Sequence, residues 1–287
     1  MAFAVPSVGV SGAYGATAVI TKPTGLATGE LMVALIEGNA GVSCSIDTLS
    51  GWTLVATQSR TNGSVSIQYK IADAGDVAAS NFTFTGTSVS RMSGAILRVT
   101  GNTATGSFDT SDADTNNAAA SATISFTTTV SPAYDGSLIV MVFGGSDGNA
   151  GAGSIGTYIA SDGSLSWSEA FDVSTDTGSV DPIGGGAYAI QTTKTALTSY
   201  GATLSHTKDD HNGIVAVFTP QINATATHSL LSADADFFAP TASAGVSGNA
   251  SLLSADADFF APEVDATSPS QWTAETKPTT SWTPESK

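Results

Sequence analysis

The chain has 287 residues, a formal net charge of −16 at pH 7 and a charged fraction of only 12%. A surface this acidic repels phosphate backbones, which argues against a nucleic-acid partner. No apolar run approaches the roughly 20 residues that a membrane-spanning helix needs, so we expect no membrane insertion. The abundance of Gly, Ser, Thr, Ala and Val is typical of short strands joined by turns, and we expect an all-β protein.

Up to about Pro220 the sequence alternates between candidate strands and turn signals such as TNG, DAG, SDG and VDPIGGG. Val65, Ile67, Tyr69 and Ile71 alternate with polar residues, as in a half-buried antiparallel strand. The runs LMVALIE and SLIVMVF are apolar on both faces and should lie at the centre of a sheet. The predicted strands span residues 16–21, 31–37, 52–58, 64–72, 81–85, 92–100, 122–129, 137–143, 165–173, 186–192, 202–206 and 213–219.

This body also contains a weak internal repeat. GELMVALIEG aligns with GSLIVMVFGG, SVSIQYKIAD with GGAYAIQTTK (Tyr69 with Tyr188), FTF with ATL, and SGAILRVTG with NGIVAVFTP, at separations of 107, 119, 120 and 119 residues. Four matches in the same order indicate two halves of similar strand order, at about 16–101 and 121–220. One sheet from each half, packed face to face, would cover the apolar faces of both. We therefore predict an antiparallel, jelly-roll-like β-sandwich with a pseudo-twofold relation.

Residues that could carry chemistry are few. Cys44 is the only cysteine, and its alternation with Val42 and Ile46 predicts a buried, unreactive position on a strand. The run HTKDDHNG, with His206 and His211 beside two aspartates, is better explained as a turn than as a metal site. The stretches DTSDADTNN and SDGNAG carry oxygen ligands without the calcium-loop spacing, so we expect no cofactor apart from a loop-bound calcium as a minor alternative. No nucleophile with a neighbouring base can be identified, and we expect no enzymatic activity.

Composition divides the chain into a body at 1–220, a repeat region at 221–265 and a terminal segment at 266–287. The repeat region contains SLLSADADFFAP twice, starting at Ser229 and Ser251. Strand geometry places its apolar residues mostly on one face, although a short helix and a simple duplicated spacer are alternatives. Each copy is too short to bury its own apolar side chains, so a partner must cover them. The predicted docking residues of the two copies are Leu231, Phe237, Phe238, Leu253, Phe259 and Phe260.

The terminal segment QWTAETKPTTSWTPESK repeats at a spacing of ten residues around Trp272 and Trp282. Its prolines and threonines favour an extended chain. Trp is enriched at interface hot spots, so we predict that both indoles anchor a partner, with folding back onto the body as the alternative. Within the body, Trp52 and Trp167 would be candidates for stacking on sugar rings if they are exposed, although core positions are more common for aromatic residues in strands.

The order of KPTGLATGELMVALIEG, SGWTLVATQ, IQYKIADAGDVAASNFTFT, SGAILRVTG, GSLIVMVFGG, AYAIQTT and GIVAVFTP resembles a β-sandwich domain that recurs in bacteriophage structural proteins and in some secreted bacterial proteins. The tail resembles the Leu-x-x-Ala-Asp-x-Phe-Phe-x-Pro and Trp-Thr-Pro-Glu-Ser-Lys repeats at the ends of phage virion proteins, including fibres and head or tail decorations. The resemblance implies a noncatalytic virion component that contacts host glycan, and it transfers no catalytic residues.

We therefore expect a virion structural protein, of the fibre, spike or decoration type. Its C-terminal repeats would dock onto capsid, portal, connector or tail proteins, or form a homo-oligomer, for which we favour a trimer. The start MAFAVPSVGV lacks the features of a secretion signal, which favours assembly in the host cytoplasm. The alternative is a carbohydrate-binding module of an extracellular bacterial system, which predicts an exposed Trp52 or Trp167. An enzyme acting on surface polysaccharide would instead need paired carboxylates in one cleft.

Overall fold

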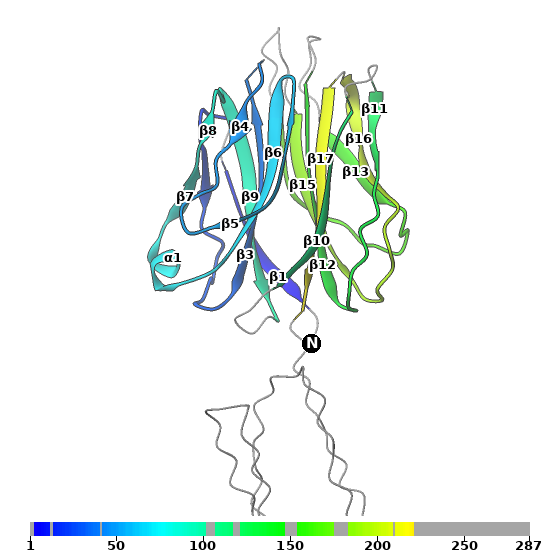
Figure 1. The fold of residues 1–287 in the computed structure, drawn as a ribbon. Helices are drawn as coiled ribbons and strands as arrows, with labels where there is room; N and C mark the ends of the chain where they lie inside the picture. Colours follow the sequence, from blue (N-terminus) through cyan, green and yellow to red (C-terminus); the bar gives the residue numbers. More distant parts are fainter. Residues whose placement is uncertain are drawn as a thin grey trace, which may run out of the picture. The chain divides into compact units, whose positions relative to one another are not determined.

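The computed structural model describes residues 3–11, 14–40, 42–101, 107–116, 121–146, 154–174, 183–208 and 210–220. Residues Met1–Asn223 form one compact unit. The described residues form 17 strands and one short helix, and all strand pairs are antiparallel (Figure 1). The predicted all-β, sandwich-like fold is therefore confirmed.

We call the part of the body from β1 to β9 half one, and the part from β10 to β17 half two. Half one is built on a five-stranded sheet with the order β1-β9-β3-β6-β5. Two pairs of short strands, β2 with β7 and β4 with β8, lie outside this sheet, and helix α1 (Ala74–Ala78) precedes β7. The strands of half one are β1 (Ala4–Val10), β2 (Ala18–Thr21), β3 (Leu31–Asn39), β4 (Ser45–Ile46), β5 (Thr53–Arg60), β6 (Gly63–Ile71), β7 (Asn81–Phe84), β8 (Gly86–Thr87) and β9 (Arg91–Thr100).

Half two repeats this plan with a five-stranded sheet of the order β10-β17-β12-β15-β14 and an outer sheet of the order β11-β16-β13. Its strands are β10 (Ser107–Asn116), β11 (Ser121–Thr127), β12 (Ser137–Ser146), β13 (Ile155–Ala160), β14 (Ser168–Ser174), β15 (Ile183–Gln191), β16 (Ser199–Lys208) and β17 (Asp210–Thr219).

The strand registers confirm the internal repeat. In half one Leu31 of β3 pairs with Val99 of β9, and in half two Leu138 of β12 pairs with Phe218 of β17. The neighbouring pair Val33–Tyr69 in half one corresponds in the same way to Val140–Tyr188 in half two. The alignment made from sequence therefore matches residues that occupy equivalent places in two equivalent sheets.

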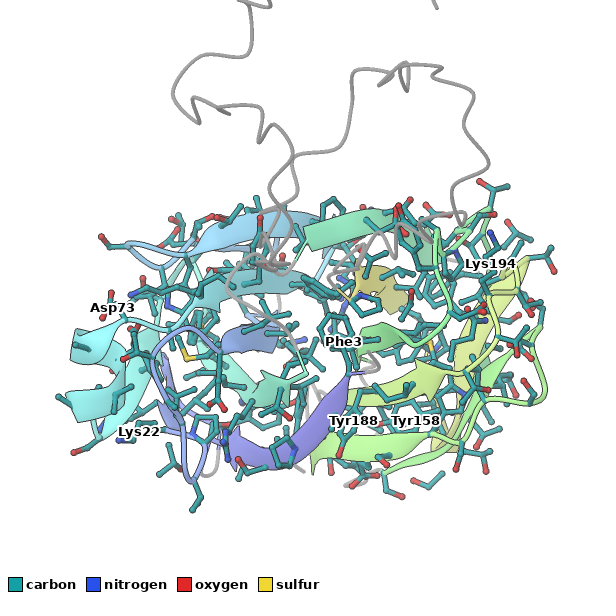
Figure 2. All side chains as sticks on the ribbon, turned by 90° about the horizontal axis from the view of Figure 1, so that it is seen from below. Phe3, Lys22, Asp73, Tyr158, Tyr188 and Lys194 are labelled. Carbon is teal, nitrogen blue, oxygen red and sulfur yellow. The ribbon has the colours of Figure 1, made fainter. Side chains whose placement is uncertain are left out.

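The two large sheets pack face to face and share one apolar core. β5 faces β10 and β17, β6 faces β12 and β17, β3 faces β12 and β15, β9 faces β14 and β15, and β1 faces β14. Exchanging each strand for its counterpart in the other half reproduces this set of contacts, so a pseudo-twofold axis passes between β3 and β12. Figure 2 looks along the strands from below and shows Phe3, a member of this core, where the halves meet. The core residues of the central layer include Leu31, Val33, Leu35, Val65, Ile67, Leu97, Leu138, Val140, Val142, Ile214 and Phe218.

Each half also has an outer core, which the sequence-based prediction of two packed sheets did not include. In half one the outer strands cover the far face of β3 and β9, around Ile20, Ile36, Trp52, Phe84 and Ile96. In half two the β11-β16-β13 sheet covers β12 and β17 in the same manner. The central strands need this second cover because LMVALI and LIVMVF are apolar at consecutive positions, which point to opposite faces.

All the strands predicted from sequence correspond to strands of the structure, but β1, β10 and β13 were missed, and the two-residue strands β4 and β8 were not among the predicted ranges either. The β1 sequence AVPSVGV contains Pro6, and the β10 sequence SFDTSDADTN is rich in aspartate, so neither has the composition of a strand. Both are edge strands of their sheets, where proline and charged residues are tolerated.

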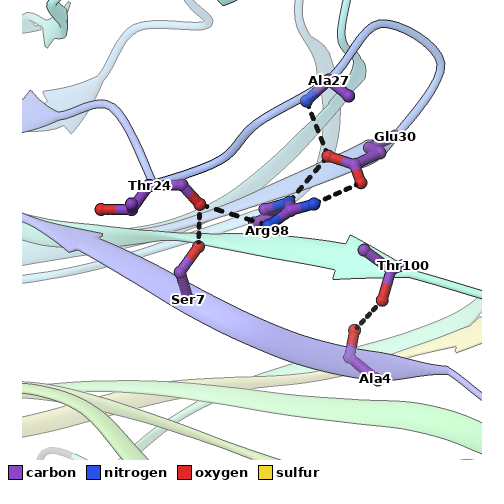
Figure 3. Close-up of polar contacts among 7 residues, drawn as sticks. All are labelled: Ala4, Ser7, Thr24, Ala27, Glu30, Arg98 and Thr100. Carbon is purple, nitrogen blue, oxygen red and sulfur yellow. Dashed lines mark hydrogen bonds and ion pairs between the residues drawn. The ribbon is translucent and has the colours of Figure 1, made fainter.

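A polar clamp holds the loop between β2 and β3 onto the sheet of half one (Figure 3). Arg98 of β9 donates two hydrogen bonds of 2.8 Å to the Glu30 carboxylate, and Glu30 also accepts from the Ala27 amide at 2.8 Å. The Thr24 carbonyl accepts from Arg98 at 3.3 Å and from the Ser7 hydroxyl at 2.8 Å. The loop is thereby fixed to both β9 and β1.

The two ends of the body lie at the same end of the sandwich. Ala4, at the start of β1, pairs with Thr100 at the end of β9, and Thr219, at the end of β17, pairs with Ser107 at the start of β10. The turn that joins β5 to β6, the end of β16 and the start of β17 lie at the opposite end, which we call the distal end (Figure 1).

Candidate functional site

The most unusual group of side chains in the body is a buried polar cluster at the distal end of the central core. It consists of Glu37 and Asn39 of β3, Arg60 of β5, Ser93 of β9 and Asn212 of β17, all essentially inaccessible to solvent. Alternation along β3 explains the position of Glu37 and Asn39. Every second residue of a strand points to the same face, and Leu31, Val33 and Leu35 point into the central core, so residues 37 and 39 do so as well. We call these five residues the axial cluster.

Hydrogen bonds of the axial cluster cross from one half to the other. Arg60 Nε donates to Asn212 Oδ1 at 3.1 Å, and Asn212 Nδ2 donates to the Gln58 carbonyl at 2.7 Å. Arg60 Nη2 lies 3.5 Å from Glu37 Oε1, which makes a fully buried ion pair. Near the cluster, the Tyr14 hydroxyl donates to the Val173 carbonyl of half two at 3.2 Å. The distal end of the interface is therefore polar and the rest of it apolar.

The Glu37 side chain occupies space that two glycines of half two leave open. A Cβ atom placed on Gly184 of β15 would lie 2.9 Å from Glu37 Cγ, and one placed on Gly144 of β12 would lie 3.1 Å from the same atom. Real Cβ atoms essentially never approach another atom to 2.9 Å, and they rarely approach one to 3.1 Å. The absence of side chains at these two positions is what admits Glu37.

Burial controls the electrostatics of the cluster. Desolvation raises the pKa of Glu37 to about 8, against the opposing effects of the Arg60 guanidinium and Tyr14. Burial also raises the pKa of the Tyr14 hydroxyl well above its usual value, and the Glu37 carboxylate raises it further. A carboxyl group held in this way is sensitive to pH in a range where exposed carboxylates are already ionised.

Several polar atoms of the cluster are buried without a hydrogen bond. Among the described residues, both carboxylate oxygens of Glu37, the amide group of Asn39 and the Ser93 hydroxyl have no hydrogen-bond partner. Buried polar atoms of this kind reduce stability. Since none of these side chains reaches solvent, the cluster joins the two halves and is not placed to act on a substrate.

A second polar group lies between the layers of half two. Asp172 of β14 accepts a hydrogen bond from the Ile155 amide at 3.0 Å, and the nearby Tyr158 hydroxyl is buried. Burial raises the pKa of Asp172 to about 6, and the charge of Glu169 raises it as well. Burial likewise raises the pKa of Tyr158.

The two tryptophans considered for glycan contact do not form an exposed surface. Trp52 is only 7% exposed and packs edge-on against Phe82 and Phe84, at ring-centroid distances of 5.7 and 5.5 Å. The condition for glycan contact, an exposed indole, is therefore not met at Trp52, which lies in the outer core of half one, the more common position for an aromatic residue in a strand. Trp167 is partly buried against the outer core of half two.

The structure also locates other residues singled out from sequence. Cys44 is buried, as predicted, but Val42 is 56% exposed and the strand there contains only Ser45 and Ile46, so the three do not share one strand face. His211 is buried at the start of β17. Within the described part of the chain no group of three or more His, Cys, Asp or Glu is placed to hold a metal ion.

The predicted docking residues lie outside the residues that the structure describes. They are Leu231, Phe237, Phe238, Leu253, Phe259, Phe260, Trp272 and Trp282. Their assignment remains a prediction.

The axial cluster was missed by reasoning from sequence. A usable signal was nevertheless present, because residues 31–36 and their aligned counterparts 138–143 are all apolar, and the next aligned pair is Glu37 and Gly144. A charged residue in one repeat opposite glycine in the other marks a place where the halves differ.

Among the described residues, no helix is long and apolar enough to cross a membrane. Compared with protein-family models, with curated proteins and with solved structures, the chain gives no match.

Proposed function

We propose that this protein is a noncatalytic structural component of a phage virion, in which residues 3–220 form a displayed body and the C-terminal repeats attach it to other virion proteins or to further copies of itself. The proposal rests on where the chain carries apolar residues that need a partner.

The observation that carries the proposal is that the body covers its own apolar faces. Each large sheet is covered on one face by the other large sheet and on the other face by outer strands. The exposed large apolar side chains of the described body are scattered over several elements, at Val10, Val19, Val42, Leu54, Tyr134 and Ile159. The body thus has little need of a partner, whereas the repeats carry leucine and phenylalanine in segments too short to bury them.

The place where the body ends is consistent with attachment through the C-terminal repeats. The described chain reaches Pro220 at the end of the body opposite the distal end. Attachment through the following residues would leave the distal end available for display. The duplicated sandwich would then serve as a rigid spacer with its loops outward.

The experiment is a comparison of native mass. The full chain is expected to be an oligomer, with a trimer favoured, and the variant with Phe237, Phe238, Phe259 and Phe260 all changed to Ser is expected to be a monomer. A matched control changes Ser232 and Ser254, which strand periodicity predicts on the polar face of the same repeats, to Ala and should leave the mass unchanged. A monomeric full chain in which these phenylalanines are protected from solvent would contradict the proposal.

A further inference from the structure

The interface between the two halves has a feature that follows from its pseudo-twofold axis. Position 37 of β3 and position 144 of β12 are equivalent in the repeat, and they face each other, since a Cβ on Gly144 would lie 3.1 Å from Glu37 Cγ. A residue on a twofold axis meets its own counterpart. The side chains allowed at this position therefore depend on which halves are paired.

Half one contributes large residues near the axis and half two contributes glycines. Val65 of β6 pairs with Glu37, and its counterpart Gly184 of β15 pairs with Gly144. Gly184 lies against Glu37, and a Cβ on Gly144 would lie 3.2 Å from Val65 Cγ1. The side chains of half one thus fill the space that half two leaves open.

The hydrogen bonds across the interface have the same asymmetry. Asn212 of half two reaches both Arg60 and the Gln58 carbonyl of half one. Its counterpart in half one is Ser93, which pairs with Glu37 as Asn212 pairs with Gly144. Among the described residues, the shorter Ser93 side chain makes no hydrogen bond across the interface.

We propose that the inner face of half one is an interface specific for the inner face of half two, and that positions 37, 65, 144 and 184 exclude pairing of either half with its own kind. Two half-one faces would place two Glu37 and two Val65 side chains in a space that holds one of each, with two carboxyl groups in contact. Two half-two faces would place four glycines together and leave a cavity. When two copies of the chain lie close together, half one of one copy can then pair only with half two of the other copy.

Two substitutions recreate the excluded contacts within a single full-length chain. Gly144→Glu and Gly184→Val each give half two the residue that half one has at the equivalent position. Each is expected to lower the thermal midpoint of unfolding by about 5–10 °C. Because a Cβ on Gly184 would lie 2.9 Å from Glu37 Cγ and 3.0 Å from Glu37 Cβ, both atoms must be removed to relieve the conflict, and Gly184→Val in a Glu37→Gly background should lower the midpoint of that background by less than about 3 °C.

The control is Val142→Leu. Val142 lies on the inner face of half two, and its counterpart in half one is Leu35. This substitution should shift the thermal midpoint much less than Gly184→Val does. If Gly184→Val does not fold, Gly184→Ala measured in the same two backgrounds provides the same comparison. A loss from the Gly184 substitution that is equal with and without Glu37, or no loss from either substitution, would overturn the proposal.

Discussion

Arg60 and Asn212 are 152 residues apart in the sequence, yet the Arg60 Nε donates a hydrogen bond of 3.1 Å to Asn212 Oδ1 across the interface of the two halves. The same asparagine donates to the Gln58 carbonyl, so one side chain of β17 holds two groups of β5. Only the tertiary structure brings these residues together, and substitutions at them therefore test how the two halves pair.

The first prediction concerns Asn212. Asn212→Ala removes both cross-interface hydrogen bonds and leaves buried partners behind, so it should reduce the free energy of unfolding by about 2–4 kcal/mol. Denaturant unfolding measures this loss. Asn81→Ala, on an exposed position of β7, is the matched control and should cost less than about 0.5 kcal/mol. Equal effects of the two substitutions would show that the contact contributes nothing.

The second prediction concerns the buried ion pair. At about pH 9, above the Glu37 pKa of about 8, Arg60→Met leaves the Glu37 carboxylate without its counter-charge and should cost about 3–5 kcal/mol. Replacing both partners, as Glu37→Leu with Arg60→Met, should cost clearly less than Arg60→Met alone, because no buried charge remains unpaired. A double variant less stable than the single one would refute this account of the pair.

The third prediction concerns pH. Glu37 has a raised pKa of about 8 in the folded protein, compared with 4.5 for an ordinary glutamate. Between these values the unfolded chain is ionised at Glu37 and the folded chain is protonated, so unfolding releases a proton. The free energy of unfolding should therefore fall as pH rises from about 5 to 8, by up to about 1.4 kcal/mol per pH unit from this group.

Unfolding by denaturant at a series of pH values tests the sign. Glu37→Gln should flatten the pH dependence of the free energy of unfolding between pH 5 and 8. Asp172→Asn should change this dependence only below about pH 6, the pKa of that carboxyl. Parallel pH profiles for the native protein and Glu37→Gln would show that Glu37 does not titrate in this range.

The fourth prediction concerns the Arg98–Glu30 clamp. Arg98→Lys keeps the positive charge but loses the paired hydrogen bonds to the Glu30 carboxylate, and it should cost about 0.5–1 kcal/mol because the pair is only partly buried. The loss should be local. Hydrogen exchange at the Ala27 amide, which donates to Glu30, is expected to accelerate while amides of β3 are unchanged. Uniform acceleration across the sheet would contradict a local role.

The fifth prediction separates the two body tryptophans. Trp52→Ala should cost about 3–5 kcal/mol, since the indole packs against Phe82 and Phe84 in an outer core. Trp167→Ala should cost less, because that side chain is only partly buried. A mild effect of Trp52→Ala would mean that the indole is not a core residue.

Much of the fold could be predicted from the sequence because its signals are local. Alternation in residues 64–71 and continuous apolar runs in β3 and β12 predicted both strand positions and central placement. The repeat separations predicted equivalent registers. β1 and β10 escaped prediction because edge strands are held by backbone pairing and tolerate proline and aspartate, so their composition carries little information.

Trp52 illustrates the opposite case. Its residue type fits both a sugar platform and a core, and only the outer strands of half one decide between the two. Periodicity shows that a side chain points to one face of a sheet, but it does not show what covers that face.

The sequence by itself determined that this chain forms a duplicated all-β body and carries separate apolar repeats after Pro220, because strand periodicity and repetition are properties of neighbouring residues. Only the tertiary structure decided that Glu37 lies against Gly144 and Gly184 and that Arg60 meets Asn212. Those contacts depend on how two sheets pack across a pseudo-twofold axis, and that packing joins residues between which no local pattern exists.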